Sequence, residues 1–114
     1  KRESVELLHN ALESGINFFD TARMYGESEA IMGEAFGPFR EKVVICTKCR
    51  HFLDRQGNIP GNKELKKIIE NSLDDSLKAL RTDYVEVFML HQAGINILEN
   101  DFISDVFLNL KKLI

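Results

Sequence analysis

The segment VVICTK, residues 43–48, decides the fold class of this chain. Its first five residues are β-branched or apolar, which is typical of a strand covered on both faces, as the strands of parallel sheets are. Two similar segments flank it, INFF at residues 16–19 and YVEVFML at residues 84–90. A polar residue closes each predicted strand, namely Asp20, Lys48 and His91.

The segments between and beside these strands have the apolar periodicity of helices. Apolar residues recur at three- and four-residue spacing over residues 5–12, 31–36, 65–80 and 102–110, which predicts four helices. Gly15 and Gly37-Pro38 stand where the first two helices should end, and Ser28 and Asn62 stand where they can cap the second and third. Residues 49–61 and 94–100 are expected to be loops.

Alternation of strands and helices predicts an α/β fold whose parallel strands are joined by right-handed crossovers, in the order α-β-α-β-α-β-α. A doubly wound dinucleotide-binding sheet would need a glycine-rich turn after its first strand, but residues 20–23 are Asp-Thr-Ala-Arg. The pattern favours part of a (β/α)8 TIM barrel, for which roughly 250 residues are typical. We expect residues 1–114 to form a single domain that is an incomplete portion of such a barrel.

Composition excludes several classes of partner. The chain has 15 basic and 18 acidic residues and no basic run, which argues against nucleic acid as a ligand. Its apolar stretches are far shorter than the roughly 20 residues of a membrane span, and residues 1–6 lack the apolar core of an export signal. Two cysteines cannot build a disulfide framework. We therefore expect a cytoplasmic protein that binds neither nucleic acid nor membrane.

The polar residues at the strand ends predict an active site. The carboxyl ends of barrel strands face the site, and neighbouring strands lie about 4.8 Å apart, so Asp20, Lys48 and His91 should converge. A lysine that loses water needs a counterion, which Asp20 supplies. An ammonium beside a phenol favours the phenolate, so Tyr25 becomes a better proton donor, and a neutral histidine can hydrogen-bond a carbonyl oxygen. The set describes an acid site for a carbonyl that receives a hydride.

Five motifs occur in order along the chain: GINFFDTA (15–22), YGESE (25–29), TK (47–48), TDYV (82–85) and LH (90–91). Together they resemble the aldo-keto reductases, NAD(P)H-dependent (β/α)8 barrels that reduce aldehydes and ketones, and the resemblance covers about residues 8–91. It implies that Tyr25 donates a proton to the carbonyl oxygen and that Lys48 increases the acidity of Tyr25. Asp20 would pair with Lys48 and contribute to the cofactor site, and His91 would orient the substrate.

The resemblance extends over only the N-terminal half of the family's barrel. Since the residues that hold the nicotinamide and the phosphates lie in the other half, most of the NADPH or NADH site is expected outside this chain, and 114 residues alone should not turn over a small-molecule carbonyl substrate. After His91 many family members carry Trp-Pro, whereas this chain has Gln92-Ala93-Gly94. An open sheet also favours self-association or pairing with the missing half barrel.

Simpler interpretations exist for each of these residues alone. Asp20 could be a turn or cap residue, Tyr25 a loop aromatic, Lys48 a solvent-exposed lysine and His91 a structural histidine. A second functional hypothesis is a non-catalytic, aldo-keto reductase-like regulatory or binding subunit that acts through protein contacts.

Two further features carry predictions. Cys46 and Cys49 have Cys-x-x-Cys spacing, but a separation of three along a strand places them on opposite faces, and zinc would need four ligands. We therefore predict no metal site, with Cys46 packed in the core. Glu86 interrupts an apolar strand on the face opposite His91, so it should pair with a lysine or arginine beneath the helices.

Overall fold

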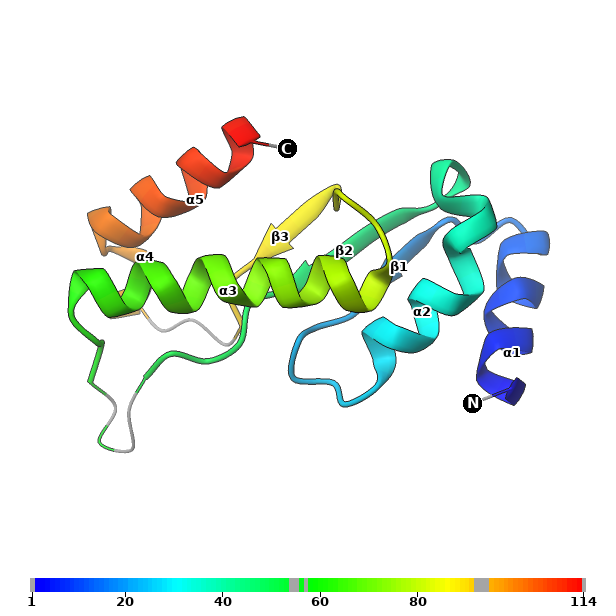
Figure 1. Ribbon diagram of the computed structural model, residues 1–114, viewed down its shortest axis with the longest axis horizontal. Coiled ribbons are helices and arrows are strands. Elements are labelled where there is room, and N and C mark those ends of the chain that lie inside the picture. Colours follow the sequence, from blue (N-terminus) through cyan, green and yellow to red (C-terminus); the bar gives the residue numbers. More distant parts are fainter. Residues whose placement is uncertain (1, 54–55, 57, 92–94, 114) are drawn as a thin grey trace.

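The computed structural model describes residues 2–53, 56, 58–91 and 95–113. Figure 1 shows short strands with helices along them. In chain order the elements are α1 (Arg2–Glu13), β1 (Phe18–Asp20), α2 (Ser28–Phe36), the 3-10 helix η1 (Gly37–Lys42), β2 (Val44–Lys48), α3 (Asn62–Leu80), β3 (Val87–Met89), α4 (Ile95–Leu98) and α5 (Asp101–Leu113). The strands form one parallel sheet in the order β1-β2-β3, which confirms the predicted class.

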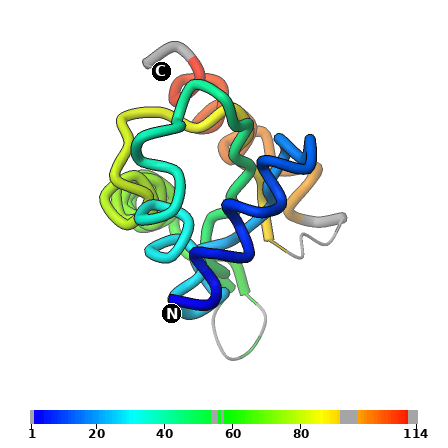
Figure 2. Tube along the Cα trace, turned by 90° about the vertical axis from the view of Figure 1, so that its right-hand side faces the viewer, coloured from blue at the N-terminus to red at the C-terminus, as the bar shows by residue number. Residues whose placement is uncertain are grey.

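The register places the carboxyl ends of the strands at one edge. Asp20 of β1 lies opposite Cys46 of β2, and Lys48, two residues further along β2, lies opposite Met89 of β3. The helices follow one another around the sheet, since α1 contacts α2, α2 contacts α3 and α3 contacts α5 (Figures 1 and 2). This arrangement is an arc of helices outside a short sheet.

The core lies between the sheet and these helices. Phe19 of β1 packs against Phe36 of α2 with ring centres 4.5 Å apart, and Phe88 of β3 stacks on Phe107 of α5 at 5.3 Å. On the other face of the sheet, Phe18 is 53% exposed and Met89 is also exposed. The radius of gyration is 15.2 Å, against about 13 Å for a compact chain of this length. The sheet is therefore packed on one face and open on the other.

Gly33 allows α2 and α3 to approach closely. A Cβ atom at this position would lie 2.5 Å from the carbonyl oxygen of Ala79 and 2.8 Å from the carbonyl carbon of Leu80, both in the backbone of α3. No side chain can be accommodated without moving a helix, so the glycine is required for this packing.

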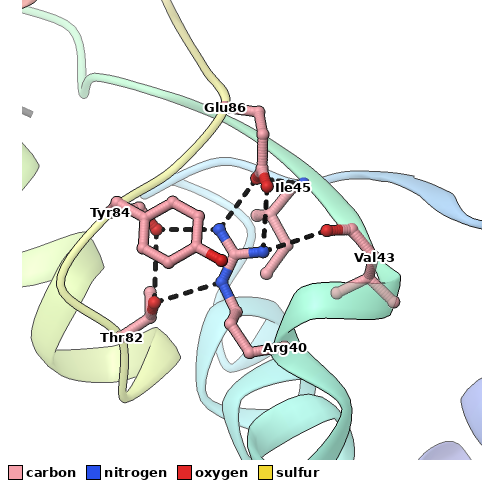
Figure 3. Close-up of polar contacts among 6 residues, drawn as sticks. All are labelled: Arg40, Val43, Ile45, Thr82, Tyr84 and Glu86. Atoms are coloured by element: carbon pink, nitrogen blue, oxygen red, sulfur yellow. Dashed lines mark hydrogen bonds and ion pairs between the residues drawn. The ribbon is translucent and has the colours of Figure 1, made fainter.

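Glu86 pairs with Arg40 of η1, which confirms the prediction that this carboxylate pairs with a lysine or arginine (Figure 3). The two guanidinium nitrogens Nη2 and Nη1 lie 2.8 and 3.2 Å from the Glu86 oxygens. Arg40 also donates to the carbonyl oxygens of Val43 and Tyr84 and to the hydroxyl of Thr82. Five hydrogen bonds thus use all five donors that a guanidinium offers.

Both predicted helix caps were wrong. The residue that precedes α2 is Glu27 and the one that precedes α3 is Gly61, and neither helix has a side-chain hydrogen bond at its cap. The Ser28 hydroxyl lies instead 2.6 Å from the Thr21 hydroxyl, because the loop between them folds back on itself.

Other boundaries also differ from the sequence prediction. The third strand was expected over residues 84–90 but covers Val87–Met89, because the Glu86 carboxylate occupies the Ile45 N–H at 2.9 Å, a donor that a neighbouring strand would otherwise use. The predicted loop at 94–100 contains α4, whose Ile97 is buried in the core. The second helix ends where it was predicted to end, since α2 stops at Phe36 with Gly37 at its C-cap, and the chain then continues as η1. Within the described residues, no helix has the length and apolar character needed to cross a membrane.

Candidate active site

The site lies at the edge where the three strands end. Thr21 N–H donates to the Cys46 carbonyl at 2.8 Å, and Arg23 N–H donates to the Lys48 carbonyl at 3.1 Å, so the loop after β1 runs alongside the end of β2. The Cys49 N–H likewise donates to the Met89 carbonyl at 2.9 Å. These backbone bonds continue the sheet by one step and hold the segments that follow the strands close together.

Asp20 and Lys48 form an ion pair at this edge. Lys48 Nζ lies 2.7 Å from Asp20 Oδ1 and donates a second hydrogen bond to the Thr21 carbonyl at 3.0 Å. The hydrogen bond from Lys48 lowers the pKa of Asp20 below its ordinary value, against a smaller opposing effect of burial. Burial alone would lower the pKa of Lys48, but the hydrogen bond and the charge of Asp20 outweigh it and raise the pKa. Both groups are therefore charged near neutral pH.

Tyr25 leans over this pair from the loop between β1 and α2. Lys48 Nζ lies 5.1 Å from the centre of the Tyr25 ring, and Tyr25 as a whole residue is 47% exposed. Gly26, which follows it, has a φ of +57°, a backbone conformation that turns the chain sharply and favours glycine. The turn leaves the ring at the rim of the site, where a bound molecule can reach it.

His91 completes the predicted set. Its ring and the Tyr25 ring form a T-shaped contact, with centres 5.6 Å apart and planes at 81°. Its Nδ1 is buried and has no hydrogen-bond partner among the described residues. Burial, together with the nearby charges of His51 and Lys48, lowers the pKa of His91, so the neutral imidazole predominates at neutral pH. The structure thus brings Asp20, Tyr25, Lys48 and His91 together.

Two residues that lie at or beside the site were not predicted from the sequence to belong to it. His51 stacks on His91, with ring centres 5.0 Å apart and planes at 28°, and it comes from the long loop after β2. Glu29 is 1% exposed and contacts Arg23 and Thr47. The available signals were the position of His51 just beyond a strand end and the position of Glu29 in the YGESE motif.

The cysteines lie beside the site as free, buried thiols. Cys46 packs in the core as predicted, and Cys49 is fully buried. Burial raises the pKa of Cys49 to about 11. Among the described residues no group of three or more His, Cys, Asp and Glu side chains is placed to hold a metal ion. Residues Gln92-Ala93-Gly94, where the chain departs from the Trp-Pro of many aldo-keto reductases, lie outside the described residues.

This arrangement suits acid catalysis at a carbonyl oxygen. It offers an exposed phenol, an ammonium that stabilises negative charge near that phenol, and a neutral imidazole at the same rim. Such a set lies at the carboxyl ends of parallel strands, the place where barrel enzymes carry their active sites.

The family profile described as the Aldo/keto reductase family matches residues 1–114, and the chain belongs to this family. Among characterised relatives it is similar to the methylglyoxal reductase YeaE of Escherichia coli (strain K12), with 34% identity over 96 residues that cover 82% of this chain and 30% of the relative. It is also similar to the "Probable voltage-gated potassium channel subunit beta" of Oryza sativa subsp. japonica, with 41% identity over 97 residues, 80% of this chain and 28% of the relative.

Solved structures give the same family. The holo form of the aldo-keto reductase AKR11C1 from Bacillus halodurans superimposes with a TM-score of 0.75 at 29% sequence identity, covering 95% of this chain and 37% of that one. The chain spans about a third of the length of the curated relatives that it matches. The three parallel strands and their helices are therefore part of a TIM barrel, as the sequence predicted.

Proposed function

We propose that the protein containing this segment reduces aldehydes or ketones with NAD(P)H and that Tyr25 donates the proton. The observation that carries this proposal is the position of the Lys48 ammonium, 2.7 Å from Asp20 and 5.1 Å from the centre of the Tyr25 ring. The ion pair between Lys48 and Asp20 is complete without Tyr25, so it does not explain why an exposed phenol lies beside the ammonium. The pairing is useful when the phenol changes charge.

Each residue has a defined task in this proposal. The Tyr25 hydroxyl gives its proton to the carbonyl oxygen as charge develops there, and the Lys48 ammonium stabilises the phenolate that remains. Asp20 holds Lys48 in place and keeps it charged. His91, neutral at working pH, donates a hydrogen bond to the same carbonyl oxygen and so orients the substrate.

NAD(P)H, when bound, supplies the hydride that the carbonyl carbon accepts. Asp20 is the residue that we assign to contact it, because its side chain remains 52% exposed on the open face of the sheet despite the ion pair. Two cations at this rim are already engaged, Lys48 with Asp20 and Arg23 with Glu29, so we assign neither to the phosphates. We accordingly propose that the 114 residues alone bind the cofactor too weakly for turnover.

Carbonyl-dependent oxidation of NADPH by the longest reading frame that contains this segment tests the proposal. Tyr25→Phe should lower kcat by about 10²- to 10⁴-fold, the usual contribution of a general acid. Tyr84→Phe is the matched control, because Tyr84 is the other of the two tyrosines and bonds Arg40 through its backbone carbonyl rather than its hydroxyl. An unchanged rate in Tyr25→Phe would contradict the assignment.

A second candidate is a regulatory subunit that acts through protein contacts. The similarity to the rice protein named as a potassium channel β subunit favours it. Purification with a stoichiometric protein partner, together with no carbonyl reduction across a broad panel of aldehydes and ketones, would support this function over the reductase.

A further inference from the structure

Glu29 is a buried carboxylate beside the candidate site that the proposed chemistry does not use. Its side chain is 1% exposed, in the first turn of α2. The Thr47 hydroxyl donates to its Oε2 at 2.7 Å, and Arg23 Nε lies 3.2 Å from its Oε1. An acidic residue favours a helix start just as well from the surface, so the helix dipole does not explain why this one is buried.

The partners of Glu29 suggest why it is buried, because its contact with Arg23 spans the loop that carries Tyr25. Arg23 and Glu29 stand on either side of Tyr25 in the sequence, so their ion pair closes the loop that carries the proposed proton donor. A second contact overlaps the first along the chain, where the hydroxyls of Thr21 and Ser28 are 2.6 Å apart. The loop is therefore held at its base by two side-chain contacts.

Thr47 connects this closed loop to the strand that carries Lys48. Successive side chains of a strand point to opposite faces, so Thr47 reaches α2 while its neighbour Lys48 reaches the site. Thr47 is fully buried, and its hydroxyl is committed to Glu29. Glu29 thus holds the Tyr25 loop against the strand on the face opposite to the site.

We propose that Glu29 is a positioning residue, which sets the placement of Tyr25 relative to Lys48 and His91 through its contacts with Arg23 and Thr47. The inference rests on the proposed function, because it assigns Glu29 a task in that reaction. A proton donor displaced by about 1 Å can lose on the order of 10²-fold in rate. Glu29→Gln should therefore lower kcat by about 10- to 100-fold and leave the KM for NADPH nearly unchanged.

Dependence on Tyr25 separates positioning from a purely structural function. If Glu29 acts through Tyr25, Glu29→Gln should lower kcat in the wild-type background and have little effect in a Tyr25→Phe background. Equal loss of rate in both backgrounds would overturn the proposal. Thr47→Val should reproduce the effect in part and Thr47→Ser, which keeps the hydroxyl, should restore it. Thr47→Val also decides the question if Glu29→Gln does not fold, because it leaves the ion pair with Arg23 intact.

A second readout does not depend on activity. With selectively labelled tyrosine and histidine, the rings of Tyr25 and His91 should give a nuclear Overhauser effect, which Glu29→Gln should weaken or abolish. The matched control is Glu27→Gln, an equal change of charge at an exposed position of the same loop, and it should keep the signal. An unaltered signal in Glu29→Gln would refute the inference. If Tyr25→Phe keeps full activity, the proposed function fails while this measurement still reports on Glu29.

Discussion

Replacement of Arg40 by lysine tests whether the guanidinium network at the amino ends of the strands stabilises the fold. Lysine keeps the positive charge near Glu86 but offers three donors on one nitrogen rather than five in a planar fork. It cannot reach the Glu86 carboxylate, two backbone carbonyls and the Thr82 hydroxyl together. The substitution therefore removes hydrogen bonds while it retains the charge pair.

The structure sets the expected magnitude. Of the five hydrogen bonds made by Arg40, lysine can keep at most three, and each of the two lost is worth about 1 kcal/mol net. Arg40→Lys should lower the free energy of unfolding by about 2 kcal/mol. Arg40→Met leaves the carboxylate without a cation and should cost about 3 kcal/mol. That is the lower end of the range for a broken buried pair, because the Glu86 side chain is 31% exposed.

Urea unfolding followed by far-ultraviolet circular dichroism measures both variants against the unsubstituted protein. Arg2→Lys is the control, since the Arg2 side chain is 94% exposed and its pair with Glu6 should contribute less than about 0.5 kcal/mol. An Arg40→Lys protein within about 0.5 kcal/mol of the parent, with an unchanged m value, would refute the argument that the fork geometry matters.

Three further predictions follow from the packing and the titrating groups. Gly33→Ala should cost roughly 1–3 kcal/mol of stability in the same assay because its Cβ would press on the backbone of α3, whereas Gly37→Ala, which meets open space, should be neutral or stabilising. Native Cys49 should be alkylated at pH 8 about 100-fold more slowly than an ordinary cysteine, as the raised pKa of about 11 implies, and at the ordinary rate in urea. Burial would raise the pKa of Glu86, but the hydrogen bonds from Arg40 and the Ile45 N–H outweigh it and lower the pKa, so its stabilisation is present above about pH 4.5 and lost in acid. The stability difference between Glu86→Gln and the parent should accordingly be largest at neutral pH and shrink below pH 4.5.

The parallel α/β class and the meeting of the strand-end side chains could be predicted because both depend on periodic features. Apolar runs that end in polar residues locate parallel strands, and the parallel arrangement brings their carboxyl ends to one edge. Side-chain alternation likewise placed Glu86 on the helix side, where Arg40 lies. The partner itself could not be predicted, because a separation of 46 residues carries no local pattern.

The start of α2 and the burial of Glu29 could not be predicted, because both depend on tertiary contacts between residues that are distant in the sequence. Ser28 could equally cap α2 or bond across the loop, and the tertiary contact with Thr21 prevailed. Glu29 had a sufficient local explanation at the start of a helix, and nothing in its neighbours indicated burial against Thr47. At both residues tertiary contacts that close the loop over the strand end, rather than the local preference for a helix start, determine where the side chain lies.

The two arginine–carboxylate pairs lie at opposite ends of β2, and each holds one end of this strand against its neighbours. Arg40 and Glu86 bind the amino end through Ile45, while Glu29 binds the carboxyl end through Thr47, next to Lys48. Ile45 and Lys48 are three residues apart, which is about 10 Å along a strand, and energies at that distance usually add. Loss of the Arg40 fork should therefore lower stability without moving Lys48 toward or away from Asp20. Glu29 reaches the strand at Thr47, two residues or about 7 Å from Ile45, so a double-mutant cycle of Arg40→Lys and Glu29→Gln measures how far this short strand couples its two ends.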